Sequence, residues 1–136
     1  MKKTIAIVMM LAVGSLAAAA SQEEEKPYFA AIGSDGIQHV EIVGGSYFFK
    51  PGHIVVKVNV PVELKVRKEA GMVPHNIAMN SPEAGIVFDV TLGDEPKIVK
   101  FTPVKRGKYS MYCTKKLLFF KSHREKGMEG LLEVVE

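Results

Sequence analysis

From residue 37 onward the sequence is divided into short apolar runs separated by turn residues, and this pattern constrains the fold most. The clearest run, 62–67, alternates apolar and charged residues, so one face of an extended segment is apolar and the other is charged. The expected strands are 37–43, 47–49, 54–58, 62–67, 75–80, 97–102, 107–113 and 131–135. About seven or eight short strands with turns between them predict an all-β, antiparallel Greek-key β-sandwich. A one-layer β-barrel is the alternative.

One segment, 114–126, does not fit this pattern, because it is basic and apolar together and contains no Gly or Pro. We expect a long loop or a short helix here, between the last two strands. Exposed apolar residues rimmed by positive charge often mark a docking site, and the rim would attract an acidic partner. The candidate docking residues are Leu117, Leu118, Phe119, Phe120, Lys115, Lys116 and Lys121. A solvated loop, or apolar residues packed beneath it, are the alternatives.

The N-terminus has the features of a secretory signal peptide over residues 1–20. Lys2 and Lys3 precede an apolar stretch, and the small residues at 17–20 provide a cleavage site before Ser21. A retained transmembrane anchor is the alternative. We expect residues 21–36 to be an acidic N-terminal tail, 37–136 to be the folded domain, and the mature chain to be periplasmic without a membrane span.

Charge and cysteine content exclude several kinds of protein. A net charge of +3 in 136 residues is too small to indicate nucleic-acid binding. One cysteine excludes an intramolecular disulfide, a Cys-rich zinc site and a four-thiolate iron–sulfur cluster. An unpaired cysteine in a secreted protein is either buried and inert or committed to chemistry.

Four residues at or between the expected strands have metal-ligand side chains. Nine residues separate Cys113 from His123, four more separate His123 from Met128, and His75 lies upstream at the start of a strand. One thiolate, two imidazoles and a thioether are the ligand set of a blue copper site, in which the methionine is axial. The alternatives are a buried apolar Cys113, a structural His75 and a Met128 that fills the core.

The residues around these ligands resemble the cupredoxin family, the small copper proteins of the plastocyanin and azurin type. The resemblance covers about residues 37–136 and rests on Phe49-x-Pro51, His75-Asn76, Gly107-x-Tyr109-x3-Cys113 and His123-x4-Met128 before the last strand. It implies the sandwich fold, one copper ion, and a role for Asn76 in ordering the site by hydrogen bonding. The segment between Cys113 and His123 is longer than in small members of the family, and comparable loops occur in the type 1 site of copper nitrite reductases.

The resemblance implies a periplasmic, type 1-like copper protein that carries one electron between redox partners, and we expect a monomer. Copper storage or delivery, and a metal-free structural sandwich, are the alternatives. We expect no enzyme activity. Tyr112 and Thr114 flank Cys113, so the His beside the Cys that a copper nitrite reductase needs is absent, and a dinuclear thiolate-bridged copper needs two cysteines.

Other candidate residues give no pattern of their own. The carboxylates Glu83, Asp89, Asp94 and Glu95 are expected in or beside turns and suggest no acid–base pair. His39 and His53 are expected at the surface or an edge. Met72, Met79 and Met111 are expected to pack, with Met72 lining the copper pocket as the alternative.

Overall fold

A computed structural model describes residues 25–116 and 119–136 of the chain. The expected signal peptide, together with Leu117 and Leu118 of the candidate docking residues, lies outside the described residues. The strands are β1 (Tyr28–Phe29), β2 (Gln38–Gly45), β3 (Phe48–Lys50), β4 (His53–Lys57), β5 (Val62–Lys68), β6 (Asn76–Ser81), β7 (Ile86–Thr91), β8 (Lys97–Phe101), β9 (Gly107–Tyr112) and β10 (Glu129–Val135), with a short 3-10 helix, η1 (Pro82–Ala84), between β6 and β7.

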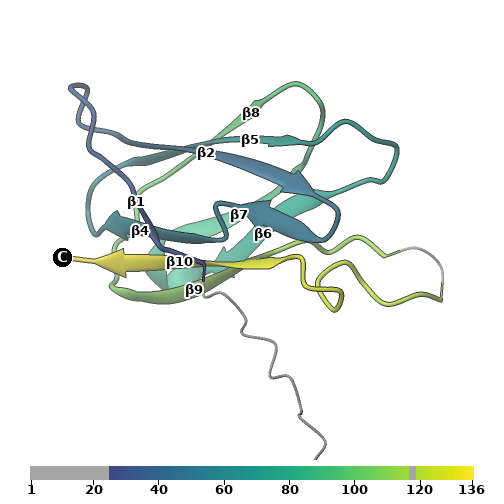
Figure 1. Ribbon diagram of the computed structural model, residues 1–136. Helices are drawn as coiled ribbons and strands as arrows, with labels where there is room; N and C mark the ends of the chain where they lie inside the picture. The colour runs from purple at the N-terminus through teal and green to yellow at the C-terminus, as the bar shows by residue number, and fades with distance from the viewer. Residues whose placement is uncertain (1–24, 117–118) are drawn as a thin grey trace, which may run out of the picture.

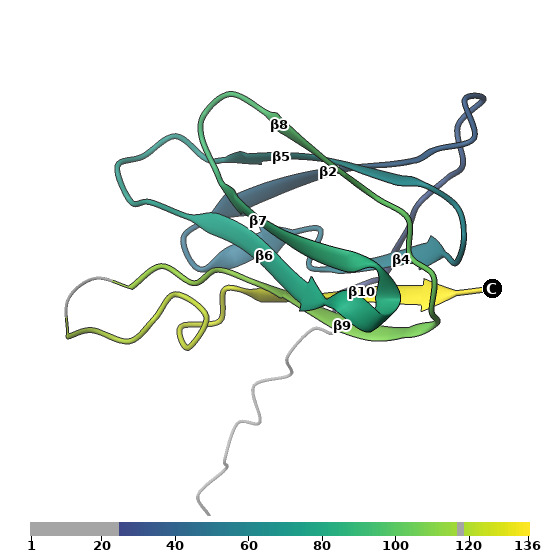
Figure 2. The ribbon, with the colours of Figure 1, turned by 180° about the vertical axis from the view of Figure 1, so that it is seen from behind.

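The strands form two sheets packed face to face. One sheet has the order β1-β4-β10-β9-β6-β7 and the other has the order β3-β2-β5-β8. Figure 1 shows β2, β5 and β8 in one layer and β4, β10 and β9 in the other, and Figure 2 shows β6 and β7 from behind. The all-β sandwich is therefore confirmed, and the one-layer barrel is not what the described residues form.

The sheets are mixed, which differs from the wholly antiparallel arrangement that we expected. Strand β4 is parallel to both β1 and β10, and β2 is parallel to β5. Parallel neighbours need a crossover connection. Here the chain passes through β4 in the other sheet before β5 returns beside β2, so the two run in the same direction. The Greek-key description of the connections stays a prediction.

The core lies between the two sheets and is built by strand alternation. In β5, Val62, Leu64 and Val66 are buried, while the charged residues between them point outward. Ile54 and Val56 of β4 are buried in the same hydrophobic core. Each such side chain contributes roughly 1.5–3 kcal/mol by leaving water. The period-two pattern that predicts these strands therefore also fixes which face of each strand is buried.

Two strands were not predicted. Tyr28 and Phe29 pair with Ile54 and Val55, so part of the segment expected to be an N-terminal tail is a strand. Both of its side chains are exposed, which explains why it gives no amphipathic signal. The other unpredicted strand, β7, lies at the edge of its sheet and has consecutive apolar residues at 86–88 instead of alternation. Asp89 is in this strand, so its placement in or beside a turn was wrong.

The described parts of the segment between β9 and β10 form a loop. In its described parts, 113–116 and 119–128, the backbone has turns and no helix. Figure 1 shows these parts projecting from one end of the sandwich. No helix in the described part of the chain is long and apolar enough to cross a membrane.

Candidate metal centre

Three metal-ligand side chains meet at the end of the sandwich where β6 begins and β9 ends. His75 immediately precedes β6, Cys113 immediately follows β9, and His123 lies in the loop between β9 and β10. Strands β6 and β9 are antiparallel neighbours, with Ala78 opposite Tyr112, so the start of one lies beside the end of the other. One ligand atom from each residue lies within 4.8 Å of the other two.

The ligand atoms are two imidazole nitrogens and one thiol sulfur. The Nδ1 atoms of His75 and His123 are 3.2 Å apart, and Cys113 Sγ is 3.5 Å from His123 Nδ1. All three side chains are buried. Two imidazole lone pairs this close repel each other unless a proton or a cation lies between them. Imidazole and thiolate suit copper and zinc rather than magnesium or calcium, so the three residues can hold one ion of that kind.

Both histidines favour the neutral form that binds metal. Burial, followed by the nearby His123 and Lys68, lowers the pKa of His75 below its ordinary value. Burial, followed by Lys126, likewise lowers the pKa of His123. A ligand must be deprotonated to coordinate, so a lowered histidine pKa reduces the competition of protons with the metal at neutral pH.

Backbone hydrogen bonds fix the segments that carry the ligands. The carbonyl of His75 accepts a hydrogen bond of 2.9 Å from the N–H of Leu92, the residue that follows β7. The N–H of His123 donates to the carbonyl of Lys115 at 2.8 Å, which joins the two sides of the β9–β10 loop. The thiol and one imidazole thus stand at strand ends, and the second imidazole stands on a loop closed by its own backbone.

Asn76 links two of these segments. Its Oδ1 atom accepts from the Thr114 N–H at 2.7 Å, and its Nδ2 atom donates to Thr114 Oγ1 at 2.9 Å and to Asp89 Oδ1 at 2.7 Å. The side chain is buried and its amide is bonded at both ends. These bonds fit the expected role of Asn76 in ordering the ligand segments, and that role stays a prediction.

Met128 lies next to the triad and is fully buried. Its N–H donates to the His123 carbonyl at 2.9 Å, and its carbonyl accepts from the Cys113 N–H at 3.2 Å. Its methyl group would come within 3.2 Å of a side-chain carbon placed on Gly44, so the glycine in β2 leaves room for it. Axial ligation by Met128 stays a prediction.

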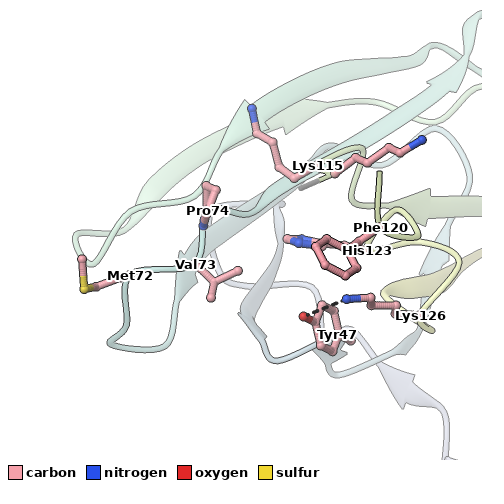
Figure 3. A pocket seen from close by; sticks show the side chains of 9 residues that line it. Tyr47, Met72, Val73, Pro74, Lys115, Phe120, His123 and Lys126 are labelled. Atoms are coloured by element: carbon pink, nitrogen blue, oxygen red, sulfur yellow. Dashed lines mark hydrogen bonds between the residues drawn. The ribbon is translucent and has the colours of Figure 1, made fainter. Parts of the chain in front are cut away.

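A pocket of about 460 Å³ opens beside the triad, and His123 is the triad member that lines it. Figure 3 shows Val73 and Pro74 on one side and Tyr47 and Lys126 on the other, with Phe120 close to His123. Of the candidate docking residues within the described chain, Phe119, Phe120, Lys116 and Lys121 are exposed and Lys115 is half-buried. Met79 and Met111 are buried in the core as expected, whereas Met72 is fully exposed and lines this pocket.

Sequence reasoning missed Tyr47. We expected it to begin a strand, but it lies in the turn between β2 and β3 with φ of 65°. Its ring is edge-on to the His123 ring, with centroids 5.2 Å apart. The pair Gly44-Gly45 suggests a break after residue 43, which was wrong because β2 continues to Gly45, and no sequence signal places the tyrosine against a residue 76 positions later.

Comparison with known proteins shows that this fold is similar to that of several solved structures. Neither a protein-family model nor a curated protein sequence matches the chain. One similar solved structure is the metal-binding domain, with Cu(I), of CopA, the Cu(I)-exporting P-type ATPase of Streptococcus pneumoniae. It is 22% identical to this chain, and the match covers 83% of this chain and 99% of that chain with a TM-score of 0.64.

Two further solved structures have the same sandwich. Auracyanin A, a blue copper protein from Chloroflexus aurantiacus, is 20% identical over 74% of this chain and 100% of that chain, with a TM-score of 0.53. The periplasmic domain of cytochrome oxidase subunit II of Bradyrhizobium japonicum is 16% identical over 72% of this chain and 83% of that chain, with a TM-score of 0.54. At these identities the likeness establishes the fold.

Proposed function

We propose that this chain, which has the cupredoxin fold, holds one copper ion and carries single electrons between redox partners. The observation that carries the proposal is the convergence of His75, Cys113 and His123 within 4.8 Å of one another at the end of a cupredoxin sandwich. Bound copper would supply a one-electron Cu(I)/Cu(II) couple. Met128 is proposed as the weak axial ligand.

The chain's own residues favour electron transfer over ligand exchange. Two of the proposed ligands stand at the ends of paired strands, and the third stands on a loop closed by backbone hydrogen bonds. A site whose ligands are held before the metal binds rearranges little when the charge of the metal changes. The electron would pass through the His123 ring, because that ring lines the pocket.

The loop between β9 and β10, which contributes Lys116 and Phe120 to the pocket wall, supports docking of a protein with an acidic surface. Among the described residues, Lys116 and Lys121 make no ion pair, and Phe119 and Phe120 are exposed beside them. Free positive charge around exposed apolar residues steers and orients an acidic partner. We further propose that the protein acts in the periplasm as a monomer, after removal of residues 1–20.

Copper storage or delivery is the second candidate, favoured by the likeness to the metal-binding domain of a Cu(I)-exporting ATPase. The two functions differ in how fast the metal leaves. An electron carrier should release copper slowly to a competing chelator, whereas a delivery protein should release it within the time of a protein encounter. The burial of the three ligands supports slow release.

The test is a visible absorption spectrum of the mature protein titrated with Cu(II), beside Cys113→Ser, His123→Ala and His53→Ala variants. We expect an intense thiolate-to-copper band that saturates at one equivalent, bleaches with ascorbate and is absent from the Cys113 and His123 variants. His53 contacts Glu133 outside the triad, so its variant should match the wild type.

The other outcomes decide between the candidates. Bound copper without an intense band would reject the type 1-like site and favour copper handling. Absence of binding would reject copper altogether. A thermal unfolding curve for each variant separates loss of the site from loss of the fold.

A further inference from the structure

The loop that carries His123 is attached to the opposite sheet through Tyr47. Tyr47 lies in the turn between β2 and β3, which belong to the four-stranded sheet, whereas β9 and β10, on either side of the loop, belong to the six-stranded sheet. The Tyr47 and His123 rings pack in a T-shaped arrangement, with centroids 5.2 Å apart and planes at 73°. This is a favoured aromatic geometry, and it restricts rotation of the imidazole.

Lys126 makes a second contact between Tyr47 and the same loop. Its Nζ atom lies 4.7 Å from the centroid of the Tyr47 ring and donates to the Tyr47 hydroxyl at 3.3 Å. Figure 3 shows Lys126 reaching toward Tyr47 beside His123. Because Lys126 follows His123 by three residues, Tyr47 touches the loop at the ligand and also at the turn behind it. The first contact restrains the imidazole directly, and the second restrains the turn that follows it.

The backbone of Tyr47 indicates that this placement has a reason. Its φ of 65° lies in the left-handed region, which a bulky residue seldom adopts. Residues in this conformation persist where the surrounding contacts hold them, and they gather near functional sites. A glycine or asparagine would fit the turn better, and neither would reach His123.

We infer that Tyr47 is a positioning residue, which holds the His123 imidazole in its metal-binding orientation before the ion arrives. This inference rests on the proposed metal site. Residues that orient a ligand without touching the metal usually alter metal affinity by about 10- to 100-fold when they are replaced. The Tyr47 ring should therefore affect how long the metal is retained.

The test compares Tyr47→Asn, Tyr47→Phe and the control Tyr28→Leu. Asparagine tolerates the left-handed turn, so the fold should survive while the ring is lost. We expect Tyr47→Asn to release Cu(I) to a chelator about ten-fold faster than the wild type. Tyr47→Phe keeps the contact with His123 and loses the hydrogen bond to Lys126, so its effect should be smaller. Tyr28 is an exposed tyrosine of β1 and its variant should be unchanged.

A second readout needs no metal. In the metal-free protein, the ring signals of His123 in an NMR spectrum should broaden and move toward the values of an unfolded chain in Tyr47→Asn. Unchanged His123 signals and an unchanged release rate in a folded Tyr47→Asn protein would overturn the inference. If Tyr47→Asn does not fold, the Tyr47→Phe and Lys126→Gln variants are tested instead. We expect broader His123 signals and faster Cu(I) release in both.

The metal-free signals also separate the two proposals. If the wild type binds no copper, the proposed function fails. The His123 signals then still show whether Tyr47 orders the imidazole.

Discussion

Asn76 accepts a hydrogen bond from the backbone N–H of Thr114, so the residue after His75 is tied directly to the residue after Cys113. The bond is 2.7 Å long and one partner is the buried Asn76 amide. It holds two of the three proposed ligands at a fixed separation whether or not a metal is present. Stability and metal binding should therefore depend on the same side chain.

The first prediction concerns this tie. Asn76→Ala should lower the free energy of unfolding of the metal-free protein by roughly 1–3 kcal/mol, because it leaves the Thr114 N–H and the Asp89 carboxylate without their partner. Urea unfolding measures the change. Asn80→Ala is the matched control, since Asn80 is an exposed residue of the same strand. Equal stability of the Asn76 variant and the wild type would show that the tie is not needed for folding.

The second prediction concerns the energy of metal binding. An ion that binds only the folded chain stabilises it by about 2.7 kcal/mol at a free concentration 100 times its dissociation constant. Adding copper should therefore raise the midpoint of thermal unfolding, and a chelator should return it to the metal-free value. The rise should vanish in His123→Ala and persist in His53→Ala. A rise of the same size in His123→Ala would place the ion elsewhere.

The third prediction concerns a charged rim formed by lysines of the loop between β9 and β10. Lys116→Glu and Lys121→Glu should slow electron transfer from the copper-loaded protein to an anionic metal complex and speed transfer to a cationic one. The difference should shrink as salt is added, because charges at an exposed surface are screened over about 10 Å at 0.1 M ionic strength.

A lysine outside this rim provides the control for that experiment. Lys65 lies in β5, in the opposite sheet, and its ammonium is near Glu41. Lys65→Glu should leave both rates close to those of the wild type. If it changes the rates as much as the rim variants do, net charge rather than the rim accounts for the effect.

The fourth prediction concerns pH. The hydrogen bond to Asp35 raises the pKa of His39 above its ordinary 6.5. While Asp35 stays ionised, the stability from this pair is therefore fully present below pH 6.5 and is lost as the pH rises through the raised pKa of His39. An NMR titration of His39 should have its midpoint above 6.5, and Asp35→Asn should move it back. Asp94→Asn, at a carboxylate beside Lys68, should leave it unchanged. A wild-type midpoint at or below 6.5 would contradict the prediction.

Sequence reasoning found strands in which apolar and charged residues alternate, such as β5, and strands with a continuous buried run, such as β4 and β6. In β5 the alternation is complete, because one face meets the core and the other meets water. It missed β1, which has two exposed residues, and β7, an edge strand whose apolar residues are partly exposed. In β1 both residues are exposed, and in β7 burial alternates but an apolar residue, Val87, lies on the exposed face, so neither sequence carries the alternating pattern.

The candidate site was predictable only in part, for a similar reason. His75, Cys113, His123 and Met128 have side chains of distinctive chemistry, three of them next to strand ends and His123 in the loop between the last two strands, and this is visible along the chain. Tyr47 and Lys126 have ordinary side chains that matter through a contact between the two sheets. Such a contact depends on how the sheets pack, which no local pattern encodes.

The complete burial of Cys113 has a consequence for the protein before any metal arrives. Oxidation to a sulfenic acid, and cross-linking of two chains through a disulfide, both require a thiolate that oxidant or partner can reach. A sulfur inside the sandwich is out of reach of another chain's sulfur. We therefore expect the metal-free protein to keep its thiol in air without forming a disulfide to another chain, and the thiol to be oxidised only when this end of the sandwich opens.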